Sequence, residues 1–224
     1  MILLFSGGLD SYIAWEYLNR PKTIYFDLGH RYAADEVSVV RKLISDTIID
    51  SRLNLADWEE PDANIPMRNA FLVMMASHYD QDIILVVQKG EMEIPDRTRD
   101  FLLHSGKEIT RLRKNKGRLY VVSSPFIYKT KTQMVRWYIR NQFEMEPLLQ
   151  TRSCYTPGDL PCGACSACFR RWVAFQNCGV SEKHVKSILN YNKIPEYVEK
   201  MMKGEYDKQR TEETLNALTK VGYL

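Results

Sequence analysis

Short apolar runs and longer amphipathic segments alternate along the chain. The short runs have the length of buried strands and lie at 1–5, 22–27, 47–50, 81–87 and 119–123. Apolar residues at helical spacing occupy 12–18, 33–44 and 65–78, and a capping box at Thr130–Gln133 starts a further helix over 134–139. Strands that alternate with helices predict an α/β fold, a parallel sheet with helices on both faces.

This alternating pattern ends near Gln150. A cysteine-rich loop follows, and then a mainly helical tail in which basic and acidic residues nearly balance. We therefore expect three parts: an α/β domain over 1–150, a four-cysteine segment over 151–178 and a helical C-terminal extension over 179–224.

The composition narrows the class of protein. The 224 residues are 45% hydrophobic with 11 glycines and 9 prolines, which excludes a disordered or collagen-like chain. A net charge of +3 does not favour a nucleic-acid partner. The N-terminal apolar run is too short for a signal peptide, and no run reaches the roughly 20 apolar residues of a membrane-spanning helix. We expect a cytoplasmic protein without a membrane partner, whose clustered cysteines bind metal more often than they form disulfides.

A glycine-containing loop separates the first strand from the first helix, with the sequence Phe5-Ser6-Gly7-Gly8-Leu9-Asp10-Ser11. In a parallel sheet this position lies outside the carboxyl end of a strand, where ligands bind. The glycines expose backbone N–H groups and the helix N-terminus adds partial positive charge, so the loop favours a phosphate. The alternative is a plain tight turn in which Asp10 or Ser11 caps the helix.

Four of the five cysteines lie within fifteen residues, at Cys154, Cys162, Cys165 and Cys168. Four thiolates can complete a tetrahedral structural zinc site, and the prolines and glycines between them let the loop fold back. An iron–sulfur cluster is the nearest alternative because such spacings also occur in ferredoxins, and disulfides come third. Cys178 falls outside the spacing and is expected to be an inert, buried thiol.

The loop string Ser-Gly-Gly-x-Asp-Ser resembles the pyrophosphatase loop of the ATP-pyrophosphatase superfamily. Further segments resemble one branch of it, the 7-cyano-7-deazaguanine synthases: 26–31 followed by Glu36, 65–72, 90–97, 125–131 and the cysteine segment 153–170. Leu28 and His30 depart from the family pattern Asp-Tyr-Gly-Gln-Arg-His. The resemblance covers most of residues 1–175 and implies an adenine-nucleotide alpha hydrolase-like fold over 1–150 with ATP at the loop.

The resemblance implies an enzyme, a ligase that forms C–N bonds. The family converts 7-carboxy-7-deazaguanine and ammonia to 7-cyano-7-deazaguanine through intermediates adenylated by ATP with Mg²⁺, in queuosine-type nucleoside biosynthesis. It also implies a structural zinc ion at the four cysteines and a homodimer.

The resemblance further implies which residues act on the substrates. Residues 5–11 would bind ATP, and the catalytic set would be Ser6, Asp10, Ser11 and Lys131, with Lys131 neutralising the α-phosphate. The deazapurine would be bound by Arg68, Asp96 and Arg97. Each has a plainer alternative: a solvated lysine, a helix cap for Asp96, and surface ion pairs for the arginines.

Two other functions stay open at this stage. One is a tRNA-modifying enzyme that adenylates a base, for which the basic stretch 107–118 could contact an RNA backbone. We favour an ordinary solvated surface there, because aromatic residues that could stack on bases are not interleaved. The other is a non-catalytic module that binds ATP or zinc and uses its C-terminal helices to bind a partner.

Overall fold

A five-stranded sheet forms the centre of the α/β part in the computed structural model, which describes residues 1–91, 94–113 and 117–224. The strands are β1 (Ile2–Leu4), β2 (Lys22–Phe26), β3 (Ile48–Asp50), β4 (Asp82–Ile84) and β5 (Val121–Ser123). Their order is β3-β2-β1-β4-β5, and every neighbouring pair is parallel. The chain therefore reverses its direction of travel across the sheet at β1, where the switch point of an open parallel sheet binds ligands.

Helices connect the strands and extend the chain beyond the sheet. Those of the α/β part are α1 (Leu9–Tyr17), α2 (Ala33–Leu43), α3 (Arg68–Ala76), α4 (Arg99–Arg113), α5 (Lys131–Arg140) and α6 (Met145–Gln150). The C-terminal helices are α7 (Ser166–Asn177), α8 (Ile194–Met202) and α9 (Lys208–Thr219). Three short 3₁₀ helices are η1 (Ala56–Trp58), η2 (Pro95–Arg97) and η3 (Ile188–Asn190).

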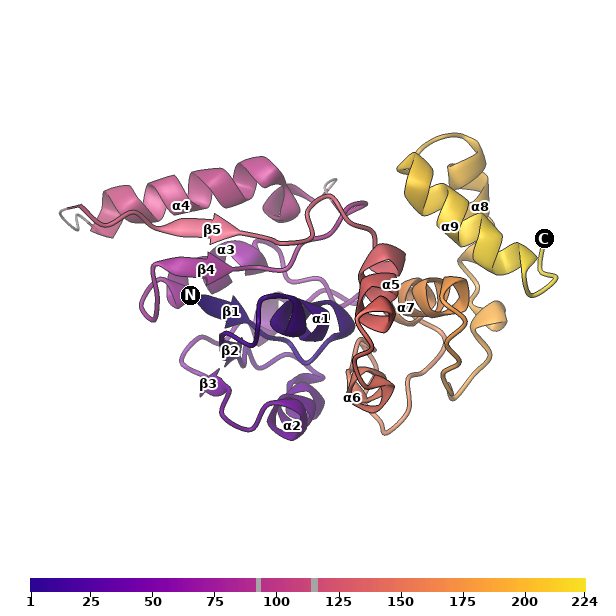
Figure 1. Ribbon diagram of the computed structural model, residues 1–224, viewed down its shortest axis with the longest axis horizontal. Helices are drawn as coiled ribbons and strands as arrows, with labels where there is room; N and C mark the ends of the chain where they lie inside the picture. Colours follow the sequence, from indigo (N-terminus) through magenta and orange to yellow (C-terminus); the bar gives the residue numbers. More distant parts are fainter. Residues whose placement is uncertain (92–93, 114–116) are drawn as a thin grey trace.

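The predicted arrangement, a parallel sheet with helices on both faces, is confirmed. Successive side chains of β1 enter two different cores, because a strand presents alternate residues to opposite faces. Leu3 and Phe5 pack with α1 and α5, whereas Ile2 and Leu4 pack with α3 and α4. Figure 1 shows the strands running toward α5 and α7, so the carboxyl ends of the strands face the C-terminal half of the chain.

Two predicted elements are shorter than the apolar pattern suggested. The strand expected over 81–87 ends at Ile84, because the Ser124 hydroxyl rather than a strand partner accepts the hydrogen bond from Val87 N–H, at 3.0 Å. The helix expected from 65 starts at Arg68, since Met67 before it adopts a left-handed φ of 59°. In the predicted basic stretch 107–118, residues 114–116 lie outside the described residues.

The C-terminal helices have a core of their own. It is built from two of the four clustered cysteines and apolar residues of α7, η3, α8 and α9. Helix α7 also packs on α5, which joins this core to the α/β part (Figure 1). In the described part of the chain, no helix combines the length and apolar character needed to cross a membrane.

Candidate active site and four-cysteine cluster

The loop after β1 is closed by hydrogen bonds within it. Gly8 N–H donates to Ser6 Oγ at 3.3 Å, and Ser11 Oγ donates to the Gly8 carbonyl at 3.1 Å. Gly7 has a φ of +68°, in the left-handed region that favours glycine. Arg152 N–H donates to the Gly7 carbonyl at 2.8 Å, so the cysteine segment holds the loop from its other side.

The alternative interpretation of the loop, in which Asp10 or Ser11 caps the first helix, does not match the structure. The N-cap of α1 is Gly8 and no described side chain caps it, so neither Asp10 nor Ser11 has the plain capping role. Asp10 instead binds the ammonium group of Lys131, the first residue of α5. The capping box of Thr130 and Gln133 that the sequence predicted is present and fixes the start of α5. Lys131 is therefore held at the loop and is not a solvated surface lysine.

A cavity of about 230 Å³ opens at the carboxyl ends of the strands. It is lined by the loop, by Lys131, and by residues of β2, α3, the segment after β4 and the cysteine segment. All four residues of the predicted catalytic set line it: Ser6, Asp10, Ser11 and Lys131. Phe5, Gly8 and Leu9 from the predicted ATP-binding loop line it as well.

One wall of this cavity is a network of partly buried charges, of which the sequence analysis had assigned only Arg97. Glu91 pairs with Arg97 at 3.1 Å and with Arg170 at 3.4 Å. Burial alone raises the pKa of the Glu91 carboxyl, but Arg97, Arg170 and Lys131 more than offset this and hold the pKa below its usual range. The carboxylate therefore stays ionised and orients the arginines. Glu91 and Arg170 lie in segments that resemble the family, and this resemblance could have identified them from the sequence.

A second wall is aromatic and comes from the end of β2. The Tyr25 hydroxyl donates to Glu36 at 2.9 Å, and His30 Nε2 lies 3.2 Å from the same carboxylate oxygen. Burial raises the pKa of the Tyr25 hydroxyl strongly and Glu36 raises it further, so the phenol keeps its proton. The His30 and Tyr32 rings meet edge to face at 4.3 Å, and Tyr155 adds a third ring. Aromatic side chains of this kind can pack against a heterocyclic ligand.

The three residues predicted to bind the deazapurine lie in different settings. Arg68 and Arg97 line the cavity. The guanidinium of Arg68 has no hydrogen-bond or ion-pair partner among the described residues, whereas that of Arg97 is paired with Glu91. Asp96 is not in the described lining of the cavity; its Oδ2 accepts from Asn69 N–H, in the first turn of α3, at 3.0 Å. Asp96 thus caps a helix distant in sequence.

The four clustered cysteines meet at one point in the C-terminal half. Their Sγ atoms all lie within 4.8 Å of one another, with Cys162 and Cys168 3.9 Å apart. A zinc ion about 2.3 Å from each of four tetrahedral ligands requires sulfurs roughly 3.8 Å apart, so the cluster fits one ion. Backbone N–H groups of Thr156 and Cys162 each donate to Cys154 Sγ at 3.3 Å. Cys165 and Cys168 hydrogen-bond to Cys154 and lower its pKa.

The fifth cysteine is separate from the cluster, as predicted. Cys178 ends α7, is free and half-buried, and donates from Sγ to the Thr132 carbonyl at 3.6 Å. Burial raises the pKa of its thiol, which keeps it protonated and unreactive.

The cysteine cluster is tied to the cavity by its immediate neighbours in sequence. Tyr155 follows Cys154, Arg170 lies two residues after Cys168, and both line the cavity. Arg170 donates to the Tyr155 hydroxyl at 3.1 Å. Arg171, the next residue, is 1% exposed and binds Glu182 at 2.7 Å. When the four cysteines are held together, Tyr155 and Arg170 are therefore held in place at the wall of the cavity.

The fold and the site together define an α/β protein with a glycine-containing loop at the switch point of its sheet and four clustered thiols that could hold a metal ion. A family model described as "Queuosine biosynthesis protein QueC" matches residues 48–179, more than half of the chain. The chain belongs to the QueC family.

Curated relatives agree with this assignment. A 7-cyano-7-deazaguanine synthase of Methanosarcina mazei is 27% identical over 81% of this chain and 95% of its own length. That of Trichodesmium erythraeum is 29% identical over 81% of this chain and 97% of its own. That of Aquifex aeolicus is 24% identical over 79% and 96%. These names favour the first of the predicted functions over a tRNA-modifying enzyme or a non-catalytic module.

Proposed function

We propose that this chain is a 7-cyano-7-deazaguanine synthase, which uses ATP to convert 7-carboxy-7-deazaguanine and ammonia to the nitrile. The observation that carries the proposal is the placement of Lys131 and Asp10 together at the loop after β1, inside a cavity that also holds Arg68, which has no partner among the described residues. Family membership and the names of the relatives support the same reaction.

The first step of the proposed reaction is attack by the substrate carboxylate on the α-phosphate of ATP. It forms an acyl adenylate and releases pyrophosphate. The N–H groups of the loop and the Ser6 and Ser11 hydroxyls would bind the pyrophosphate, and the Lys131 ammonium would neutralise charge on the α-phosphate. Lys131 would have to exchange part of its contact with Asp10 for the phosphate.

Ammonia then displaces AMP to give the amide. A second adenylation, on the amide oxygen, is followed by loss of AMP and leaves the nitrile. Arg68 is suited to meet the substrate carboxylate, because its guanidinium lines the cavity without a partner among the described residues. Arg97 and Asp96 stay as proposed substrate residues in supporting positions. A flat deazapurine matches the wall formed by His30, Tyr32 and Tyr155.

Two ions complete the proposal. Zinc at Cys154, Cys162, Cys165 and Cys168 would be structural, since all four positions of a tetrahedral ion are filled by protein. Asp10, the carboxylate of the loop, would help to hold Mg²⁺, which would supply neutralisation of the charge that develops on the phosphates.

We further propose an enzyme of the cytoplasm that works as a homodimer, with an ATP-binding part over 1–150, the cysteine segment 151–178 and the extension 179–224. Four free, clustered thiols suit a reducing compartment. The partners are small molecules, and no membrane or nucleic acid is required.

The proposal is tested with purified protein, ATP, Mg²⁺, ammonium and 7-carboxy-7-deazaguanine. We expect AMP, pyrophosphate and a nitrile product by mass spectrometry, and ATP–pyrophosphate exchange that depends on the deazapurine but not on ammonium. AMP release that requires tRNA and ignores the deazapurine would refute the proposal. Metal analysis that finds iron in anaerobic protein would refute zinc.

A further inference from the structure

A second, smaller cavity of about 50 Å³ lies next to the first. Its walls come from the segment after β4, the start of α5, and helices α7, α8 and α9. Glu91, Lys131 and Arg170 line both cavities and so form a wall that the two share. A water-sized molecule needs about 10–15 Å³, so this cavity holds a few such molecules. It is too small for a nitrogen donor that carries an amide group.

The wall of this cavity contains two buried oxygen atoms without hydrogen-bond partners among the described residues. One is Oε1 of Gln88, a residue that is 4% exposed. The other is Oγ1 of Thr132, a residue that is 1% exposed and directly follows Lys131 in α5. Unpartnered buried polar atoms are costly, and the cost is removed when a small ligand donates to them. Both atoms accept hydrogen bonds, so they suit a ligand that carries N–H groups.

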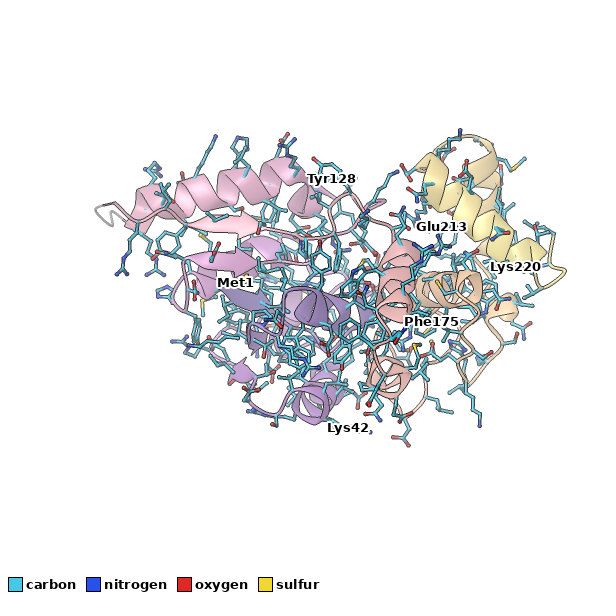
Figure 2. The ribbon with its side chains drawn as sticks, viewed as in Figure 1. Met1, Lys42, Tyr128, Phe175, Glu213 and Lys220 are labelled. Atoms are coloured by element: carbon cyan, nitrogen blue, oxygen red, sulfur yellow. The ribbon has the colours of Figure 1, made fainter. Side chains whose placement is uncertain are left out.

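Most of the charged side chains around the cavity are paired. Four cationic and two anionic side chains line it: Lys89, Lys131, Arg170, Arg210, Glu91 and Glu213. Lys131 contacts Asp10, and Lys89 lies 3.5 Å from Asp207. Arg170 lies 3.4 Å from Glu91, so these pairs leave little net charge to attract a charged ligand. Glu213 also accepts a hydrogen bond from the Thr130 hydroxyl at 2.6 Å, which fixes its carboxylate at the α5 side of α9, as Figure 2 illustrates.

We propose that this second cavity binds the ammonia used in the reaction, with Gln88 and Thr132 accepting its hydrogen bonds and Glu213 accepting the proton released by ammonium. This inference rests on the proposed function. Ammonia is the size of water, donates up to three hydrogen bonds and reacts only when neutral. A small cavity with two unpartnered acceptor oxygens and the carboxylate of Glu213 as a proton acceptor matches these three properties.

The amination step balances with this assignment. Ammonium first loses one proton to the carboxylate of Glu213, which passes it to solvent. The lone pair of ammonia forms the C–N bond to the acyl carbon of the adenylate while the bond from that carbon to the AMP oxygen breaks, and the electron pair leaves with AMP. The nitrogen then loses a second proton to solvent to give the amide.

The experiment separates nitrogen binding from adenylation in a Thr132→Val variant, which keeps the shape of the side chain and removes the acceptor. The Michaelis constant for ammonium, varied as ammonium chloride, is expected to rise about tenfold, the effect of one lost hydrogen bond. ATP–pyrophosphate exchange with 7-carboxy-7-deazaguanine, measured without ammonium, is expected to stay at the wild-type rate. Glu213→Gln, in which the amide oxygen can still bind Thr130, is expected to slow amide formation and likewise leave exchange intact.

Thr219→Val is the matched control. Its hydroxyl donates to the Leu215 carbonyl on the exposed end of α9, away from the cavity, so it should change neither quantity. The ammonia site alone would be overturned by two results together. Thr132→Val would show normal exchange and an unchanged Michaelis constant for ammonium, and Glu213→Gln would form the amide at the wild-type rate. If the wild-type protein shows no exchange with the deazapurine, the proposed function fails first and the ammonia site falls with it.

Discussion

Gly163, in the middle of the cysteine segment, offers a sharp test of how this segment is held. Its φ is +71°, and a Cβ at this position would lie 1.9 Å from the Lys186 carbonyl oxygen. We predict that Gly163→Ala opens the segment and weakens metal binding. Gly179 is a matched control, because it has a φ of +72° and a Cβ added there would meet none of the described residues within 4 Å.

The expected cost has two parts. A left-handed alanine costs about 1–2 kcal/mol in either variant. At Gly163 the Lys186 carbonyl must also move by at least 1 Å, since Cβ atoms essentially never approach another heavy atom closer than 3.0 Å. That movement pulls on two hydrogen bonds, from Val185 N–H to Pro161 at 2.9 Å and from Lys186 N–H to Cys162 at 3.1 Å. Each is worth about 0.5–1.5 kcal/mol, so the free energy of unfolding should fall by about 2–5 kcal/mol.

The assay compares thermal melting and metal release in the two variants. About 2–4 °C of melting temperature accompanies each kcal/mol in a chain of this size. Gly163→Ala should therefore lower the melting temperature about 1.5 to 4 times as far as Gly179→Ala, and it should lose zinc to a chelator faster. Equal melting temperatures and equal rates of zinc release would refute the close approach at Gly163.

Three further predictions rest on individual contacts. Lys131→Met removes the cation at the loop and should reduce ATP–pyrophosphate exchange by about 10²–10³-fold, whereas an exposed lysine changed in the same way should not. Arg171→Met leaves the buried Glu182 without its partner, and denaturant unfolding should show a loss of about 3–5 kcal/mol; a loss below 1 kcal/mol would contradict the pairing. Hydrogen bonds from Arg52 hold the pKa of Asp50 below its usual range, despite burial. This pair therefore stabilises the fold above about pH 4, the pKa in the unfolded chain, and loses its effect as pH falls further. Asp50→Asn should flatten the decline in melting temperature on acidification, and an unchanged decline would refute the assignment.

Local patterns in the sequence were enough to predict the five strands, helices α1, α2, α3 and α5, and the two chemical motifs, whereas α4 and α6 were not predicted. Alternating apolar runs gave the parallel sheet, because burial on both faces requires a continuous apolar strand. The capping box at Thr130 and Gln133 could be predicted because its hydrogen bonds join residues three apart. The spacing of the four cysteines indicated a metal site for the same reason: short, glycine-containing segments between them limit how far the thiols can separate.

Only the tertiary structure decided which charged side chains meet. Lys131 and Asp10 are 121 residues apart, and Arg170 and Glu91 are 79 apart, so no spacing rule joins them. Asp96 was predicted to bind substrate, with a cap on the helix after Pro95 as the alternative, and only the fold shows that its carboxylate accepts from the first turn of α3. The order of strands and the packing of α7 on α5 bring these groups to the same edge of the sheet. Side-chain partners of this kind depend on the path of the whole chain, whereas strands, caps and cysteine spacing depend on a few neighbouring residues.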